Sequence, residues 1–356
     1  MRIKLAVLLL VLLSSGCDQS VPEEKGFAGM GNQAAAFTPV VAGRAFSFPA
    51  DHGPHDGFRI EWWYVTANLK DEQGHEFGAQ WTLFRSALKA TPEVPGWENQ
   101  TIWLGHAAVT SATVHHAAER YARGGVGQAG VSLAPFNAWI DDWRFSSQST
   151  ADPLGEMQLN ARDKAFSYQL RLTSNRPLVL QGDKGFSQKS EQGQASYYYS
   201  QPFFQASGTL EIDGKHYQVS GPAWLDREWS SQPLTANQTG WDWFSLHLDS
   251  GEQVMLYRMR QKDGAAYLTG TWIDAQGQTR LLQSSDIRLT PQDTARVAGR
   301  SMPVRWSIQI PDKQLDIVIS ALNPNAWMDL RIPYWEGPVR LSGSHGGQGY
   351  LEMTGY

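Results

Sequence analysis

The sequence predicts an all-β fold with two antiparallel β-barrel domains in tandem. Its 356 residues include 15 Trp, 12 Tyr and 14 Phe, while 34 Gly and 18 Pro supply turn residues. This composition favours strands and turns over helices. Apolar and β-branched segments also alternate with turn residues about every 8–15 residues, which is typical of antiparallel sheets.

Residues 1–17 have the pattern of a bacterial lipoprotein signal peptide. Arg2 and Lys4 precede an apolar run at residues 5–13, which is too short for a membrane-spanning helix of about 20 residues. Small residues and Cys17 follow in the order of a lipobox, so we expect Cys17 to be lipidated. The lipid would anchor the protein without a transmembrane helix, and it accounts for the single cysteine.

The same segment predicts the compartment. A lipidated Cys17 indicates a periplasm-facing lipoprotein of the bacterial cell envelope. Asp18 favours retention at the inner membrane, with the outer membrane as the alternative. Residues 18–44 are small, polar and rich in Gly and Ala, so we expect them to form a tether between the lipid and the first domain.

Charge and cysteine content exclude several classes of function. The 30 basic and 35 acidic residues give a net charge of −5, whereas nucleic-acid binders are strongly basic. One cysteine rules out an intrachain disulfide, a four-cysteine zinc site and an iron–sulfur cluster. We therefore expect no nucleic-acid partner and no cysteine-bound metal centre. No cofactor is predicted, and no metal is expected at the histidine-containing loop described below.

Four hairpins are predicted where strand-like segments flank short turns. In the first, residues 59–70 and 75–85 flank an acidic turn that ends in Gly74. The others pair residues 208–213 with 216–225, 241–248 with 253–259, and 265–274 with 279–282. A further strand is expected at residues 139–145 and one short helix at residues 117–123.

A faint internal repeat predicts where the two domains divide. An aromatic strand, an acidic turn with Gly and a second strand that ends in an aromatic residue and Arg begin at residue 61 and again at residue 241. The polar segment at residues 230–239, which contains Pro233, separates the two blocks. We expect domains at residues 45–232 and 233–356. Each would close so that no strand edge is exposed, with residues 349–356 as a closing strand.

The segment around Asp226 is the first candidate site. Alternate residues of a strand face the same side, so Trp224, Asp226 and Glu228 would share one face and Arg227 would lie on the other. A carboxyl group beside indole rings has a raised pKa and can act as an acid. The alternative is structural: Asp226 or Glu228 pairs with Arg227 or another arginine and holds the domain junction.

Two aromatic clusters have both functional and structural interpretations. Tyr197 and Tyr199 share one face of a strand and suit either a ligand cavity or a barrel wall. Trp241, Trp243 and His247 share one face of another strand, where a lone histidine is more often a core residue than a catalyst.

The loop at residues 51–56 holds two Asp and two His, which are metal-ligating residue types. Its Gly and Pro leave these side chains without a regular element to orient them, so a polar turn is the preferred interpretation. The sequence also lacks the nucleophile elbow, the zinc-protease motif and the phosphate-binding loop.

Several of these segments together resemble the AttH-like or carotenoid hydratase (hydroxyneurosporene synthase) family. The resemblance rests on four segments, residues 61–64, 196–200, 223–229 and 349–356, and it extends from about residue 46 to residue 356. It implies two lipocalin-like β-barrel domains in tandem. It also implies kinship with fungal pericyclases of the same double-barrel fold.

The resemblance further implies a reaction. Carotenoid hydratases add water across an isoprenoid double bond, which requires an acid that protonates carbon and aromatic faces that stabilise the cation. The family's aromatic-x-Asp pair falls on Trp224 and Asp226, and its His-x-Trp pair falls on Tyr197 and Tyr199. In this chain, Tyr thus replaces both the His and the Trp of the His-x-Trp pair. The replacement should therefore affect the binding of an apolar ligand less than it affects the hydration reaction.

Two functions from different classes follow. In the first, an envelope-anchored lipoprotein binds an apolar ligand (a lipid, isoprenoid or polyketide-like molecule) and, if it is an enzyme, transforms it as a hydratase or lyase. Asp226 would donate the proton, Tyr197 and Tyr199 would position substrate or water on the same side, and Trp224 would offer a π face. The other expected ligand contacts are Trp63, Glu228, Trp241, Trp243 and His247.

In the second function, the protein is a non-catalytic accessory lipoprotein of an envelope ABC transporter with permeases of the lipoprotein-release type. A third interpretation is glycoside hydrolysis by Asp226 and Glu228, because two carboxyl groups on one strand face have roughly the separation of a retaining pair. No carbohydrate motif in the sequence supports it.

Overall fold

The computed structural model describes residues 36–149, 152–232 and 234–356. The predicted signal peptide with Cys17, and Asp18 after it, lie outside the described residues. Within them the chain forms antiparallel strands and no α-helix, with two short 3-10 turns, η2 (Ala50–His52) and η3 (Pro311–Lys313). None of these elements is a helix with the length and apolar character needed to cross a membrane.

The first sheet has 13 strands in the order β4-β3-β2-β1-β13-β12-β9-β8-β7-β6-β5, with β10 and β11 paired to β12. Its strands are β1 (Ile60–Asp71), β2 (Glu76–Ala87), β3 (Thr101–Ser111), β4 (His115–Arg123), β5 (Ala129–Leu133), β6 (Phe136–Ile140), β7 (Trp143–Ser147), β8 (Glu156–Arg162), β9 (Phe166–Thr173), β10 (Val179–Leu180), β11 (Phe186–Gln188), β12 (Ala195–Ile212) and β13 (Lys215–Ser230).

The second sheet has ten strands in the order β17-β16-β15-β14-β25-β24-β22-β21-β18, with β23 paired to β24. Its strands are β14 (Gln238–Leu248), β15 (Gln253–Gln261), β16 (Tyr267–Ile273), β17 (Thr279–Leu282), β18 (Arg288–Pro291), β21 (Arg305–Ile310), β22 (Leu315–Ala321), β23 (Trp327–Met328), β24 (Tyr334–Gly343) and β25 (Gly347–Met353). A separate ribbon joins β19 (Thr294–Val297) to β20 (Arg300–Pro303).

Both sheets return their last strand to their first, which confirms the predicted all-β fold of two tandem barrels. β13 pairs with β1, and β25 pairs with β14. Residues 349–356 therefore contribute the closing strand, as predicted. Neither sheet closes fully, because the edge strands β4 and β5 of the first sheet, and β17 and β18 of the second, are not paired with each other.

Each sheet curls around its own apolar core. In β1, Trp63, Val65 and Ala67 belong to the core of the first sheet, whereas Trp62 and Tyr64 face the second sheet. In β14, Phe244 and Leu246 belong to the core of the second sheet, and Trp243 faces the first. The alternation of a strand thus gives each sheet one face for its own core and one for its neighbour.

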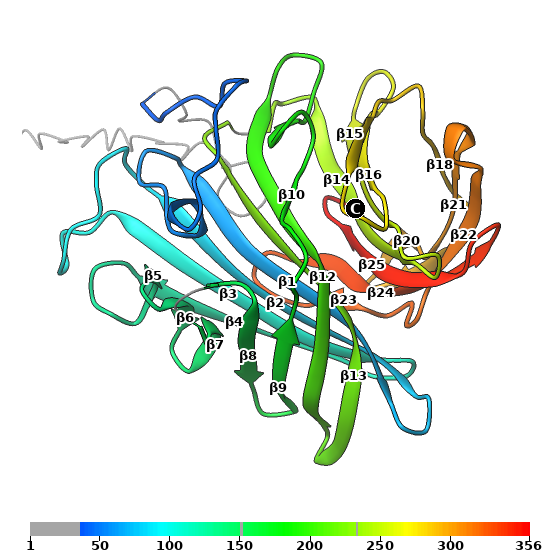
Figure 1. The fold of residues 1–356 in the computed structure, drawn as a ribbon, viewed down its shortest axis with the longest axis horizontal. Helices are drawn as coiled ribbons and strands as arrows, with labels where there is room; N and C mark the ends of the chain where they lie inside the picture. Colours follow the sequence, from blue (N-terminus) through cyan, green and yellow to red (C-terminus); the bar gives the residue numbers. More distant parts are fainter. Residues whose placement is uncertain (1–35, 150–151, 233) are drawn as a thin grey trace, which may run out of the picture.

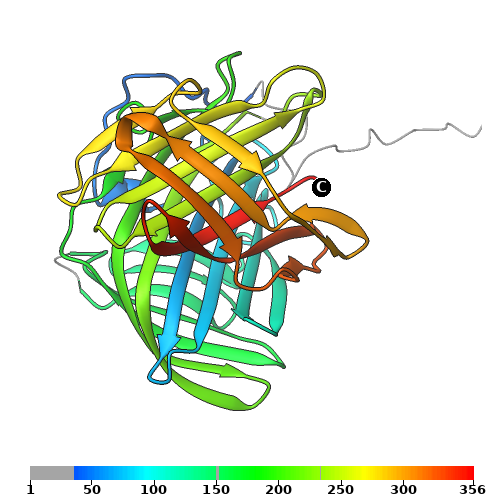
Figure 2. The ribbon, with the colours of Figure 1, turned by 90° about the vertical axis from the view of Figure 1, so that its right-hand side faces the viewer.

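The two sheets pack side by side (Figure 1), and Figure 2 shows the same arrangement from the side. Hydrogen bonds join them: Asn68 Nδ2 donates to the Gly349 carbonyl over 2.8 Å, and His106 Nδ1 lies 2.9 Å from Tyr334 Oη. Tyr64 also donates to Glu336. These groups are buried, so the contact excludes water.

All four predicted hairpins are present, but two local predictions were wrong. Residues 117–123 belong to β4, which pairs with β3, and are not a helix. Ala118 and Ala122 lie in the core four residues apart, a spacing that fits both a helix turn and a strand face. The strand predicted at residues 139–145 is two strands, because Asp141 adopts a left-handed conformation (φ 53°) between β6 and β7.

Candidate active site

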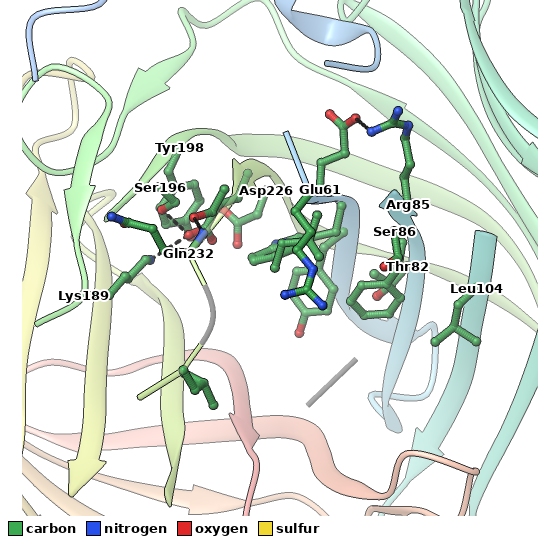
Figure 3. A pocket seen from close by; sticks show the side chains of 18 of the residues that line it. Glu61, Thr82, Arg85, Ser86, Leu104, Lys189, Ser196, Tyr198, Asp226 and Gln232 are labelled. Carbon is green, nitrogen blue, oxygen red and sulfur yellow. Dashed lines mark hydrogen bonds and ion pairs between the residues drawn. The ribbon is translucent and has the colours of Figure 1, made fainter. Parts of the chain in front are cut away.

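A cavity of about 450 Å³ lies between the two sheets. The first sheet supplies Trp62 and Tyr64 from β1 and Asp226 from β13, and the second supplies Trp243 from β14 and Glu352 from β25. Figure 3 shows Lys189, Ser196, Tyr198 and Asp226 gathered on one side of this cavity. The cavity therefore combines aromatic faces with carboxyl groups from both sheets.

Asp226 is buried on the cavity wall without a cationic partner among its hydrogen bonds. Its Oδ1 accepts from Trp224 Nε1 over 2.7 Å and from Ser200 Oγ over 2.5 Å. Burial raises the pKa of Asp226 to about 7, against the hydrogen bonds from Ser200, Trp224 and Tyr198, which lower it. Both the acid and the carboxylate are therefore populated at neutral pH, which is the condition for a general acid or base.

Arg227 is not the partner of Asp226 or Glu228 that the structural alternative for this segment named. Arg227 lies on the opposite face of β13, with its guanidinium carbon 3.8 Å from the centre of the Trp63 ring. Its charge partner is Glu61, and a second buried arginine, Arg85, also pairs with Glu61 over 3.1 Å. The predicted face shared by Trp224, Asp226 and Glu228 is confirmed.

Glu228 is held in a different way from Asp226. Lys189 Nζ lies 2.8 Å from its Oε1, and Ser196 Oγ also donates to it. The same ammonium lies 4.5 Å from the centre of the Tyr257 ring, within the range of a cation–π contact. Glu228 thus lines the cavity as the carboxylate of an ion pair.

The second sheet contributes carboxyl groups that the sequence did not single out. Glu352 accepts from Trp241 Nε1 over 2.6 Å. Burial raises the pKa of Glu352 to about 7, and the nearby charges of Glu228 and Asp226 add to the increase. Glu336 is paired with Glu352 across β24 and β25. Burial raises the pKa of Glu336 well above its usual range.

Tyr197 and Tyr199 do not face the cavity, so the prediction that they share a side with Asp226 was wrong. They are paired with Trp229 and Arg227 across β12 and β13 and belong to the core of the first sheet. Tyr198, which lies between them, lines the cavity and bonds to Asp226. The odd-numbered tyrosines also have partners of their own: the Tyr197 hydroxyl donates to the Val41 carbonyl over 2.9 Å.

The remaining predicted ligand contacts separate into two groups. Trp241 and Trp243 line the cavity, and Trp243 Nε1 donates to Tyr198 Oη over 3.2 Å. Trp63 is in the core of the first sheet and not on the cavity wall. His247 packs against Trp224 with 5.7 Å between ring centres. Burial lowers the pKa of His247 to about 4, which keeps it neutral.

The prediction that Trp224 offers the face of its ring to the cavity was wrong. Its indole N–H donates to Asp226, and its ring packs among buried residues between the sheets. The structure therefore gives Trp224 a role in holding Asp226. The cavity residues that sequence reasoning missed are Tyr64, Lys189, Tyr198 and Glu352. A signal was present for Glu352, a lone carboxylate in the apolar closing strand.

The loop at residues 51–56 is built from internal hydrogen bonds. His55 bridges Asp51 and Glu61, with 3.1 Å from a ring nitrogen to each carboxylate. Asp51 also pairs with Arg44 over 2.6 Å. Burial alone would raise the pKa of Asp51, but these hydrogen bonds hold that pKa below its usual range. Among the described residues, no group of three or more His, Cys, Asp or Glu is arranged to hold a metal ion.

Comparisons with known proteins show which family shares this architecture. The family model described as AttH-like matches residues 39–356. A protein described as an AttH from Nitrosomonas europaea is 35% identical, with a TM-score of 0.78, and the match covers 90% of this chain and 100% of that one. No protein in the curated collection compared with the chain matches it.

Two more distant structures share the fold. Kievitone hydratase from Nectria haematococca is 16% identical, with a TM-score of 0.66, over 89% of this chain and 95% of that one. CghA, solved with Sch210972, is 13% identical, with a TM-score of 0.56, over 89% and 95% of the two chains. At these identities the likeness is one of fold alone. The family model and the 35% identical structure show that the chain belongs to the AttH-like family.

Proposed function

We propose that the protein binds an apolar molecule in the cavity between the sheets and adds water to it, or removes water from it, by acid catalysis at Asp226. One observation carries the proposal: a buried carboxyl group with a pKa near 7 lies on the wall of an aromatic cavity and is not neutralised by an arginine. Such a group can carry the proton that the reaction requires at neutral pH.

The aromatic walls suit the charge that develops in this chemistry. Trp62, Trp241, Trp243, Tyr198 and Tyr257 all line the cavity. Protonation of a carbon–carbon double bond leaves a cation on the second carbon, and aromatic faces attract a cation through their quadrupoles. Ionised carboxylates in the same cavity would stabilise that charge further.

The proposed hydration balances its atoms through two carboxyl groups. Asp226 transfers its proton to one carbon of the double bond and becomes a carboxylate. The oxygen of a water molecule bonds to the cationic carbon, and the proton that water releases passes to a carboxylate. Glu352, on the wall supplied by the second sheet, has the pKa for that role. Proton exchange with solvent then restores both groups, and dehydration follows the reverse order.

Kinship of fold supports the reaction class. Kievitone hydratase, whose name states a hydration, shares the double-sheet architecture at 16% identity. The proposal for this chain rests on its own cavity and takes only the class of reaction from that protein. Without a reaction, binding in the same cavity would serve an accessory role beside a transporter.

We also propose that the protein is a lipoprotein of the bacterial envelope, which faces the periplasm and is anchored at Cys17. The support is the order of basic residues, apolar run, small residues and cysteine at residues 1–17. Metabolic labelling with a radioactive fatty acid would label the chain and not its Cys17→Ser variant. Equal labelling of both would contradict the proposal.

The decisive experiment on the reaction is to identify the bound molecule. Native mass spectrometry of the protein purified from its own envelope, with extraction of the ligand, should reveal an apolar molecule. The Asp226→Asn variant should retain that molecule but fail to change its mass by one water. A wild-type protein that carries no apolar molecule, or an Asp226→Asn variant that converts it at the wild-type rate, would contradict the proposal.

A further inference from the structure

Exposed apolar side chains are concentrated at one edge of the cavity. Of the ten large apolar side chains that are exposed in the described residues, six lie on β3, β4 or the connections that flank these two strands, and three of the six line the cavity. Trp97 is 76% exposed and Leu88 is 55% exposed. Soluble proteins rarely expose such side chains in one place unless the patch binds something. We call this set the rim, and it consists of Leu88, Val94, Trp97, Ile102, Tyr121 and Val126.

The rim is held in place by hydrogen bonds. Leu88, Val94 and Trp97 belong to the connection between β2 and β3, and Val126 belongs to the connection between β4 and β5. The Gly96 N–H donates to the Gly125 carbonyl over 2.7 Å, which ties the two connections together. Gly125 has a φ of +79°, and a Cβ there would lie 2.5 Å from the Gly96 carbonyl oxygen. Glycine is therefore required for this close approach.

The rim is continuous with the cavity. Leu88, Ile102 and Tyr121 line the cavity and are also exposed to solvent. Ile102 and Tyr121 lie on the outer face of β3 and β4, the face whose inner part packs against the second sheet. An apolar molecule that enters the cavity past these residues would meet apolar surface from the outside inward.

The described chain also begins at this edge. Phe37 lines the same cavity as Leu88. Figure 1 shows the blue start of the described chain at the same end of the molecule as the cyan connection between β2 and β3. Cys17 and Phe37 are 20 positions apart, which a fully extended chain spans in about 70 Å. A lipid on Cys17 would therefore keep Phe37, at the mouth of the cavity, within about 70 Å of a bilayer.

From these observations we propose that the rim docks on the surface of a lipid bilayer, so that the apolar ligand passes between the membrane and the cavity. This inference rests on the proposed function, since it requires an apolar ligand. Trp97 suits a bilayer surface because its ring is apolar and its N–H bonds to water or to headgroups. Lys89 and Arg123, both exposed beside the rim, suit anionic lipids, while Glu93, Glu98 and Glu119 are the acidic groups nearby.

The first test compares two positions in the full chain, reconstituted in vesicles of phosphatidylethanolamine and phosphatidylglycerol. Trp97→Cys and Leu281→Cys variants each carry an environment-sensitive fluorophore, and the parent chain treated in the same way gives the background from Cys17. Leu281 is an exposed apolar residue of β17 in the second sheet and is the matched control. We expect a blue shift, and several-fold stronger quenching by nitroxide-labelled lipid, at position 97 and not at position 281.

Equal responses at the two positions, or no response at either, would overturn the proposal. So would a response at position 97 that depends on protein concentration and not on lipid, because a second copy of the chain would then cover the rim. The vesicles contain no other protein, so a protein partner cannot produce the expected result.

The second test uses diphenylhexatriene, an apolar polyene probe. The Trp97→Asp variant should take up the probe from vesicles several-fold more slowly than the wild type, while its affinity for the probe added from solution stays unchanged. Uptake from vesicles at the wild-type rate would contradict membrane docking. Failure of the wild type to bind the probe at all would instead count against the proposed function.

Discussion

Among single residues, two carboxyl groups on neighbouring strands illustrate how surroundings set protonation. Asp226 and Glu61 are both buried, and burial raises the pKa of each. Asp226 has only neutral hydrogen-bond donors, so its pKa remains near 7. The positive charges of Arg227 and Arg85, with a hydrogen bond from His55, hold the pKa of Glu61 far below its usual range. The first group is suited to proton transfer and the second to structure.

The buried network around Glu61 should be strongly stabilising. The side chains of Glu61, Arg85 and Arg227 are fully buried. Glu61→Gln would leave two buried arginines without their shared partner, which costs about 3–5 kcal/mol when a buried pair is broken. Urea unfolding measures the effect. Glu156→Gln is the control, because Glu156 pairs with Arg171 in an exposed position and should change little. Equal effects of the two substitutions would contradict this prediction.

The raised pKa of Asp226 predicts a pH-dependent effect of Asp226→Asn. Between about pH 4 and pH 7 the folded state binds a proton at Asp226 that the unfolded state has lost. Wild-type stability therefore loses this contribution as the pH rises through that range. The variant lacks the titrating group, so its stability relative to the wild type should increase from pH 4 to pH 8. Denaturant unfolding of both proteins across this range measures the difference.

Asp51→Asn is the control of opposite sign. The pKa of Asp51 is lowered in the folded state, mainly through His55 and Arg44 acting against burial. Its contribution is present above about pH 4 and is lost as the pH falls. Asp51→Asn should therefore be most destabilising at neutral pH and least at acid pH. An Asp226→Asn variant with the same trend would show that Asp226 has no raised pKa.

Among elements, the pairing of β12 with β13 decides which tyrosine meets Asp226. Alternation along residues 196–200 was predictable from local sequence, because successive side chains of a strand point to opposite faces. The face that carries the cavity was not predictable, since it depends on the register in which Ser200 lies opposite Asp226. Glu352 was missed for the same reason: β25 reaches the cavity only through its pairing with β14.

This register predicts different effects of two similar substitutions on β12. Tyr198→Phe removes a hydrogen bond that lowers the pKa of Asp226. A hydrogen bond to a charged group contributes about 1.5–3 kcal/mol, and a pKa difference of one corresponds to about 1.4 kcal/mol. The pKa of Asp226 should therefore rise by about one or two. Tyr199→Phe should leave the pKa of Asp226 unchanged, because the Tyr199 hydroxyl lies in the core of the first sheet, 2.7 Å from His52 Nδ1.

Carbon-13 NMR of the Asp226 carboxyl group across a pH series measures both variants. Tyr199→Phe is matched to Tyr198→Phe in strand, residue type and burial. If the two variants shift the pKa of Asp226 equally, the shift does not come from the hydrogen bond of Tyr198. The assignment of Tyr198 to the site would then fail.

Across the whole molecule, the candidate site exists only while the two sheets are docked. Asp226 and Tyr64 line the cavity from the first sheet, and Trp243 and Glu352 line it from the second. Tyr64 donates to Glu336 across the contact, and Trp243 donates to Tyr198. Sequence patterns predicted two barrels but could not predict this contact, because outward-facing aromatic residues such as Trp62 and Trp243 suit a ligand cavity and a domain interface equally.

Gly78 offers a way to separate the sheets without touching the cavity. It lies on β2, and a Cβ there would be 2.4 Å from Tyr350 Oη and 2.8 Å from Pro338. Gly78→Leu would therefore force the second sheet away, and such overpacking costs about 1–3 kcal/mol. Gln73→Leu, in the exposed turn before the same strand, is the control.

Gly78→Leu should bind diphenylhexatriene several-fold more weakly and unfold in two steps, whereas Gln73→Leu should match the wild type. Because each sheet keeps its own core, circular dichroism of Gly78→Leu should still show full β content. A Gly78→Leu protein that binds the probe as tightly as the wild type would contradict a binding site formed jointly by the two sheets.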